Sequence, residues 1–167
     1  GLIHPGLIAC APSQELLEKW NRREKELINS NPSRVPPLAN PPEAKGAVAG
    51  LATKEKAKKI ITEGARTIPP REHGGNCDIK NLSKGARLFL PVYVDGANLS
   101  LGDLHFSQGD GEMTFCGAIE MAGWIHLGVD LIPGGMKKYG MLNPIFQTGP
   151  MGPHYQDHLV FEGISVD

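Results

Sequence analysis

The chain has 167 residues, of which 40% are hydrophobic, and a formal net charge of −1. This length corresponds to one domain or part of one, and the near-neutral charge argues against a nucleic-acid-binding protein and against binding to an anionic membrane. No apolar run is long enough to span a bilayer.

The cysteines and the chain ends add two expectations. Cys10, Cys77 and Cys116 lack the spacing of a metal finger, and their odd number favours a reducing compartment over a disulfide framework. No signal peptide is recognisable, because the short apolar start is followed at once by His4-Pro5. The chain has no initiator methionine and stops within an apolar run, so we expect a fragment or a processed piece.

Two helices are predicted in the first half of the chain, after an extended start over residues 1–12. Ser13 is placed to cap a helix over about residues 14–28, in which apolar side chains recur at helical spacing. Thr53 begins a second helix over about 54–65, whose lysines we interpret as a solvated face. Five prolines between the helices exclude regular helix and predict a long irregular loop over 29–52.

Strands dominate the prediction for the second half. Alternating or apolar runs followed by turn residues predict three strands, at 87–94, 123–132 and 159–166. A proline-rich loop is predicted over 136–157. The high contents of glycine (21) and proline (14) also favour a loop-rich β protein. We therefore expect a mainly β fold resembling a β-sandwich or jelly roll, with two short helices in the N-terminal half.

The predicted domain organisation follows the same division. A helix- and loop-rich segment over 1–86 is expected to pack on the sheet, and residues 87–167 are expected to form the β-sandwich core. The two parts together are expected to make one incomplete domain over residues 1–167.

The segment from Asp103 to Glu120 holds the densest set of ionisable side chains. Strand alternation puts Asp103, His105 and Ser107 on one face, with Leu104 and Phe106 toward an apolar core. The following run places five further residues on one face, namely Glu112, Thr114, Cys116, Ala118 and Glu120. Gly109-Asp110-Gly111 between the runs favours a hairpin.

A hairpin closed at Gly109-Asp110 would gather polar side chains on one patch. Its register would set Ser107 opposite Glu112, His105 opposite Thr114 and Asp103 opposite Cys116. Glu112 and Glu120 would be roughly 26 Å apart along an ideal strand, so both could serve one site only if Gly117 bends the strand.

Several kinds of chemistry remain open for this patch. Asp-x-His with a nearby carboxylate suits zinc, manganese or iron, and a metal-bound water could attack an unreactive carbonyl. Alternatively, Cys116 or Cys77 could act as the nucleophile, although a buried inert thiol is the plainer interpretation of each. A third possibility is a non-catalytic β-sandwich module that holds a structural ion such as calcium.

The upstream segment GGNCD contributes further polar candidates. Gly74-Gly75 allows a sharp turn or a close approach to a ligand. Asn76 and Asp78 would be neighbours on one face of a strand, or would cap backbone groups in an Asx-type turn.

The chain resembles the formamidase branch of the acetamidase/formamidase family. The resemblance lies in the stretches GLIHPGLIACAPS, RTIPPREHGGNCDIKNLSKGARLFLPVYV, LSLGDLHFSQGDGEMTFCGAIEMAGW, NPIF and LVFEGISVD. It implies hydrolysis of short-chain amides, formamide first, to a carboxylate and ammonia. It also implies a largely β architecture, a cytoplasmic setting, a homo-oligomer and a bound divalent metal. Family members continue beyond both ends of this chain, so the missing N- and C-terminal parts are expected partners.

The resemblance gives the polar residues hypothetical roles. Asp103 and His105 are expected to bind a divalent ion, zinc first and calcium as the alternative, with Asp78 or a glutamate completing the shell. Glu112 or Glu120 is expected to deprotonate the water and then protonate the departing ammonia. For the oxyanion, the expected donors are Asn76 or the backbone amides near Gly74-Gly75. The expected ligand is a small amide, with no nucleic acid and no membrane.

Overall fold

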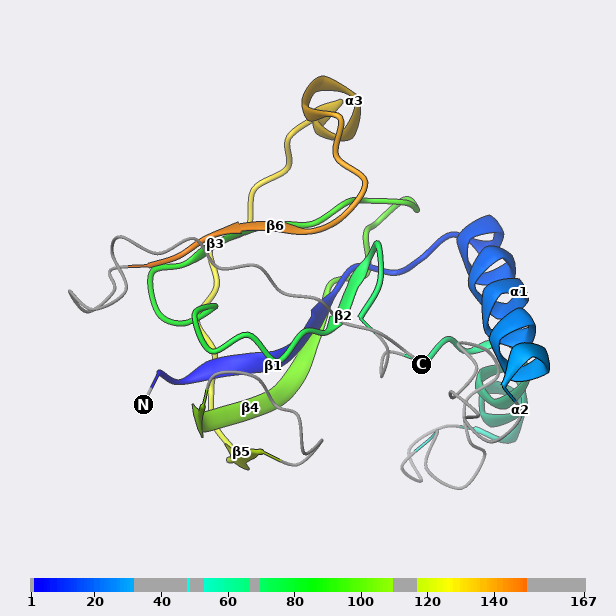
Figure 1. Cartoon of the computed structure of the whole chain (residues 1–167), viewed down its shortest axis with the longest axis horizontal. Coiled ribbons are helices and arrows are strands. Elements are labelled where there is room, and N and C mark those ends of the chain that lie inside the picture. Colours follow the sequence, from blue (N-terminus) through cyan, green and yellow to red (C-terminus); the bar gives the residue numbers. More distant parts are fainter. Residues whose placement is uncertain (1, 32–47, 49–52, 67–69, 110–116, 150–167) are drawn as a thin grey trace. The chain divides into compact units, whose positions relative to one another are not determined.

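The structure is a computed structural model that describes residues 2–31, 48, 53–66, 70–109 and 117–149. The chain divides into two compact units (Figure 1). Among the described residues, one unit contains helices α1 and α2, and the other contains six strands and the short helix α3. No helix in the described ranges is long and apolar enough to cross a membrane.

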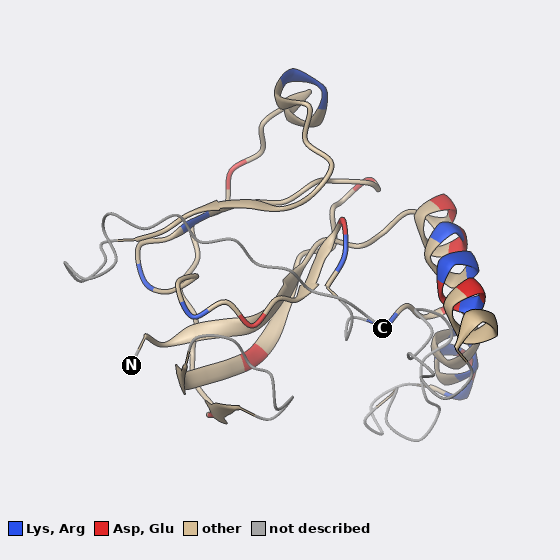
Figure 2. Cartoon of the chain, viewed as in Figure 1, with Lys and Arg blue, Asp and Glu red and all other residues tan. Residues whose placement is uncertain are grey.

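Both predicted helices are confirmed. Helix α1 spans Gln14–Ser30, and the Ser13 hydroxyl accepts the backbone N–H of Leu16 at 3.2 Å. Helix α2 spans Lys54–Glu63, and the Thr53 hydroxyl caps it in the same way. Each cap satisfies one of the donors that the first turn of a helix leaves without an intrahelical partner. Acidic and basic side chains are interspersed along α1, as expected of a solvated face (Figure 2).

Four strands form the sheet that carries the candidate site. Its order is β2 (Gly74–Asn76), β1 (His4–Ala9), β4 (Ser100–Gln108) and β5 (Ala118–Glu120), and all neighbours are antiparallel. Strand β1 lies between β2 and β4, so the start of the chain runs beside two segments that are distant in sequence (Figure 1).

A second, two-stranded antiparallel sheet pairs β3 (Arg87–Phe89) with β6 (Ile145–Gln147). Helix α3 (Gly135–Tyr139) precedes β6. The described residues therefore combine antiparallel sheets, as predicted, with three helices, and these sheets do not close into a barrel.

One of the three predicted strands is wrong, and the strand predicted over 87–94 is present only as β3 over Arg87–Phe89. Residues 121–132 form no strand, and Val129 and Leu131, predicted to face inward, are 71% and 74% exposed. Alternation shows which side chains could be buried, but a strand also needs a hydrogen-bonded neighbour, and the described residues provide none there. Within the predicted loop 136–157, α3 and β6 occur instead. The predicted strand at 159–166 lies outside the described residues, as does most of the predicted loop at 29–52.

The predicted antiparallel pairing of β4 with the run that ends at Glu120 is confirmed, but its register was wrong, and residues 110–116 of the predicted hairpin lie outside the described residues. His105 is paired with Glu120 rather than Thr114, and Ser107 with Ile119 rather than Glu112. The reason is that β4 pairs with β5 at 118–120, further along the chain than a turn closed at Gly109-Asp110 would allow. The register also shifts by one residue between His105 and Ser107, which alternation alone does not reveal.

The burial of β4 departs from the prediction at two neighbouring residues. Phe106, predicted to face an apolar core, is 53% exposed, whereas His105 on the polar face is 1% exposed. The reason is tertiary, because the His105 ring packs edge-on against the ring of His4 on β1.

Candidate metal centre

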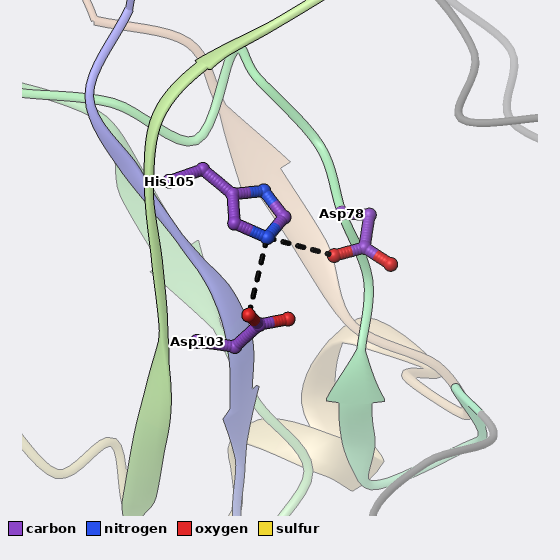
Figure 3. A group of neighbouring side chains, drawn as sticks. All are labelled: Asp78, Asp103 and His105. Atoms are coloured by element: carbon purple, nitrogen blue, oxygen red, sulfur yellow. Dashed lines mark ion pairs between the residues drawn. The ribbon is translucent and has the colours of Figure 1, made fainter. Parts of the chain in front are cut away.

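Three side chains converge beside β1, from two separate parts of the sheet. Asp103 and His105 lie on β4, and Asp78 lies shortly after β2 (Figure 3). One potential ligand atom from each residue lies within 4.8 Å of the others. Nε2 of His105 is 3.2 Å from Oδ1 of Asp103 and 3.7 Å from Oδ1 of Asp78. The three residues expected to bind a metal are therefore brought together.

Gly6 on β1 has no side chain, and this leaves room for Asp78, Asp103 and His105 to approach one another. A Cβ atom at this position would lie 2.7 Å from Asp103 Oδ2, 2.7 Å from Asp78 Oδ1 and 2.8 Å from His105 Cε1. The carbonyl oxygen of Gly6 also accepts the backbone N–H groups of Cys77 and Asp78, at 2.8 and 3.0 Å. Gly6 thus holds the segment that carries Asp78 and keeps the centre of the cluster open.

Both aspartates have an unusual backbone conformation. The φ angles of Asp78 and Asp103 are +50° and +51°, in the left-handed region that non-glycine residues rarely adopt. Such a conformation costs about 1–2 kcal/mol per residue, although aspartate tolerates it better than most. Backbone outliers of this kind cluster at functional sites, and here two of them supply the two carboxylates of one cluster.

The electrostatics of the cluster favour positive charge. Burial lowers the pKa of His105, but the hydrogen bond to Gln108 and the charges of Asp103 and Asp78 raise it by more. The net pKa of His105 therefore lies above its ordinary value, because Gln108 accepts a hydrogen bond from one ring nitrogen and two carboxylates face the other.

The donor set is one that divalent cations use. One imidazole nitrogen and two carboxylates suit zinc, manganese or iron, and carboxylate oxygens also suit calcium. Together with the space above Gly6, the residues present fit a bound divalent ion.

Of the other predicted site residues, some lie near the cluster and some lie outside the described residues. The Asn76 side-chain amide donates to Asp78 Oδ2 at 2.9 Å, so Asn76 orients one of the three candidate ligands. Glu120 is paired through its backbone with His105, and its own side chain is exposed. Glu112 and Cys116 lie outside the described residues, and Cys77 is half-buried next to Asp78.

Three residues of this region were not predicted from the sequence, namely Gly6, His4 and Gln108. Gly6 and His4 lie on β1, about 100 positions from β4, and only the pairing of these strands brings them to the cluster. Gln108 lies three positions after His105, but alternation along a strand predicts opposite faces for these two residues. The bulge in β4 changes this arrangement.

Comparisons with known proteins agree with the resemblance seen in the sequence. The chain is 62% identical over 167 residues to a formamidase of Methylophilus methylotrophus, and 58% identical over 168 residues to an acetamidase of Mycolicibacterium smegmatis. A solved structure, a gamma lactamase from Delftia acidovorans, is 66% identical and superposes with a TM-score of 0.80. Each comparison covers 100% of this chain, which spans only 41% of each of these relatives. A sequence model of the Acetamidase/Formamidase family matches residues 1–167, and the chain therefore belongs to the acetamidase/formamidase family.

Proposed function

We propose that the protein hydrolyses short-chain amides, formamide first, to a carboxylate and ammonia. Relatives at 62% and 58% identity are named formamidase and acetamidase. The observation that carries the proposal is the meeting of Asp78, Asp103 and His105 over Gly6. Because the chain spans 41% of those relatives, the proposal concerns the whole protein of which this chain is a part.

Asp103, His105 and Asp78 would hold the divalent ion, with zinc as the first candidate and calcium as the alternative. When bound, such an ion polarises an amide carbonyl and lowers the pKa of a water molecule. The two carboxylates provide the negative charge, and the ring of His105 provides a nitrogen ligand from a buried position.

Proton transfer is assigned to a glutamate. Glu120 or Glu112 would take the proton of the attacking water and return it to the departing ammonia. The pairing of Glu120 with His105 supports Glu120, because residues paired across neighbouring strands have Cβ atoms about 5 Å apart.

The oxyanion would be stabilised by Asn76 or by backbone amides near Gly74-Gly75. A side-chain amide has two N–H donors. The bond from Asn76 to Asp78 uses one of them, so this contact is compatible with a second role for Asn76.

We further propose a cytoplasmic homo-oligomer in which the antiparallel sheets belong to a larger β-sandwich. The relatives are longer than this chain, and the corresponding parts of the protein would pack against it. Trp124, Val129 and Leu131 support this proposal, because they are 93%, 71% and 74% exposed in this chain.

The test combines elemental analysis of the intact purified protein with ammonia release from formamide before and after chelation. Stoichiometric metal, with activity lost on chelation and restored by zinc, is the expected result. His105→Ala should lose metal and activity together, whereas Glu120→Gln should keep the metal and lose turnover if Glu120 transfers the proton. A metal-free protein with full activity would refute the proposal and direct attention to Cys116 or Cys77 as a nucleophile.

A further inference from the structure

The buried ring of His105 has a second set of contacts, on the side away from the carboxylates. Its Nδ1 atom is 3.0 Å from Oε1 of Gln108 and 3.2 Å from Nε2 of His4. Nε2 of His4 is itself 2.9 Å from Oε1 of Gln108. These three atoms therefore meet at one point, and the position of the hydrogen atoms decides whether they attract or repel one another.

The orientation of the Gln108 amide is set by its other end. Nε2 of Gln108 donates a hydrogen bond to the backbone carbonyl oxygen of Asp78. A backbone carbonyl can only accept, so the amide nitrogen must lie on that side. The amide oxygen of Gln108 must then face the two histidine rings, where it too can only accept.

The tautomer of His4 follows from the same kind of contact. Nδ1 of His4 is 2.7 Å from the backbone carbonyl oxygen of Leu2, so Nδ1 carries the proton of the neutral ring. Nε2 of His4 is then an acceptor as well. Two acceptors, from Gln108 and His4, both face Nδ1 of His105.

We infer that Gln108 is a positioning residue that, together with His4, keeps the proton of neutral His105 on Nδ1. With the proton there, one N–H group lies between the two acceptors and offsets their own contact at 2.9 Å. With the proton on Nε2, the carboxylate of Asp103 would accept it, but three lone pairs would meet within 2.9–3.2 Å in a buried place.

This tautomer presents the lone pair of Nε2 to the carboxylates of Asp103 and Asp78. That is the form of imidazole that binds a metal ion, and outer hydrogen bonds of this kind fix the ring orientation of metal-binding histidines. Because Gln108 also bonds the backbone of Asp78, one side chain links two of the three candidate ligands. The metal-binding consequence rests on the proposed function, whereas the tautomer itself does not.

The first experiment measures the tautomer directly. The intact protein, labelled with ¹⁵N-histidine and freed of metal, is studied by magic-angle-spinning NMR at a pH at which His105 is neutral, with His105→Asn to assign the signals. The wild type should have a protonated Nδ1 and a bare Nε2. In Gln108→Leu, which keeps only the His4 acceptor at Nδ1, the share of the Nε2-protonated form should rise, because the carboxylate of Asp103 accepts the proton there.

Gln108→Glu and Gln147→Leu are the matched variants. Gln108→Glu keeps an oxygen acceptor toward the ring and should retain the wild-type tautomer, although it loses the N–H group that bonds Asp78. Gln147→Leu makes the same change at an exposed position of β6 and should alter nothing.

The second experiment measures zinc affinity by competition with a chelator. Gln108→Leu should weaken binding by about 10- to 100-fold, and Gln147→Leu should have the wild-type Kd. A protonated Nε2 in neutral wild-type His105, or an unchanged tautomer and zinc Kd in Gln108→Leu, would overturn the inference. The wild-type spectrum decides the point even if Gln108→Leu does not fold. An inactive protein with the expected tautomer would count against the proposed function alone.

Discussion

The substitution Gly6→Ala tests the candidate metal centre through its geometry. The added Cβ would lie 2.7 Å from Asp103 Oδ2 and from Asp78 Oδ1, whereas ordinary van der Waals contact begins near 3.4 Å. Each carboxylate oxygen must therefore retreat by about 0.7 Å if it moves straight away from the new atom. Metal sites tolerate deviations of only about 0.2 Å in ligand distance, so the three groups could no longer surround one ion.

The same geometry predicts that the variant still folds. The atoms that the new Cβ would meet belong to side chains rather than to backbone, so they can move without displacing the sheet. We expect a stability loss of about 1–3 kcal/mol, as for other overpacked sites. Zinc affinity should fall about 100-fold, by analogy with the loss of catalytic rate that a misplacement of about 1 Å can cause.

The assay is chelator competition for the zinc Kd, with chemical denaturation of the metal-free protein in parallel. Gly102→Ala is the matched control, because Gly102 also lies within a strand of this sheet and a Cβ there would meet nothing within 4 Å. A zinc Kd in Gly6→Ala equal to that of Gly102→Ala would refute the assignment of the metal to this cluster.

Three further predictions concern single residues. Asn76→Ala removes the hydrogen bond to Asp78 and should weaken zinc binding about tenfold; an unchanged Kd would show that Asn76 does not orient the ligand. Burial lowers the pKa of His73 from 6.5 to about 4 in the folded protein. The unfolded chain therefore binds a proton more readily between these values, so the contribution of neutral His73 to stability is complete above pH 6.5 and is lost as the pH falls to 4. This contribution is up to about 3 kcal/mol. His73→Gln should flatten the pH dependence of the unfolding free energy across that window, and equal slopes in both proteins would contradict the prediction. Ser13→Ala removes the cap on the Leu16 N–H and should lower the stability of the unit containing α1 by about 1 kcal/mol in urea denaturation, with no effect on zinc binding.

Local features of the sequence determined the helices. A hydroxyl residue before a run of helical apolar spacing was sufficient to locate α1 and α2, because an N-cap and a 3.6-residue period act within one segment of chain. The Asp-x-His motif also singled out Asp103 and His105, since carboxylate and imidazole groups close together in sequence are typical metal ligands, whereas Asp78 became a candidate ligand through the family resemblance. The pairing of β4 with β5 followed from the two alternating runs.

Only the tertiary structure decided the register and the surroundings of the site. Strand β5 begins only at Ala118, so His105 pairs with Glu120, six positions beyond the predicted Thr114, and the irregularity in β4 shifts the register by one residue more. Gly6 and His4 reach the cluster through the pairing of β1 with β4, across about 100 residues of sequence. The role of Gly6 depends on the space beside it, and the role of His4 depends on its hydrogen bond to His105. Both form only when β1 pairs with β4, so no local pattern in the sequence could reveal them.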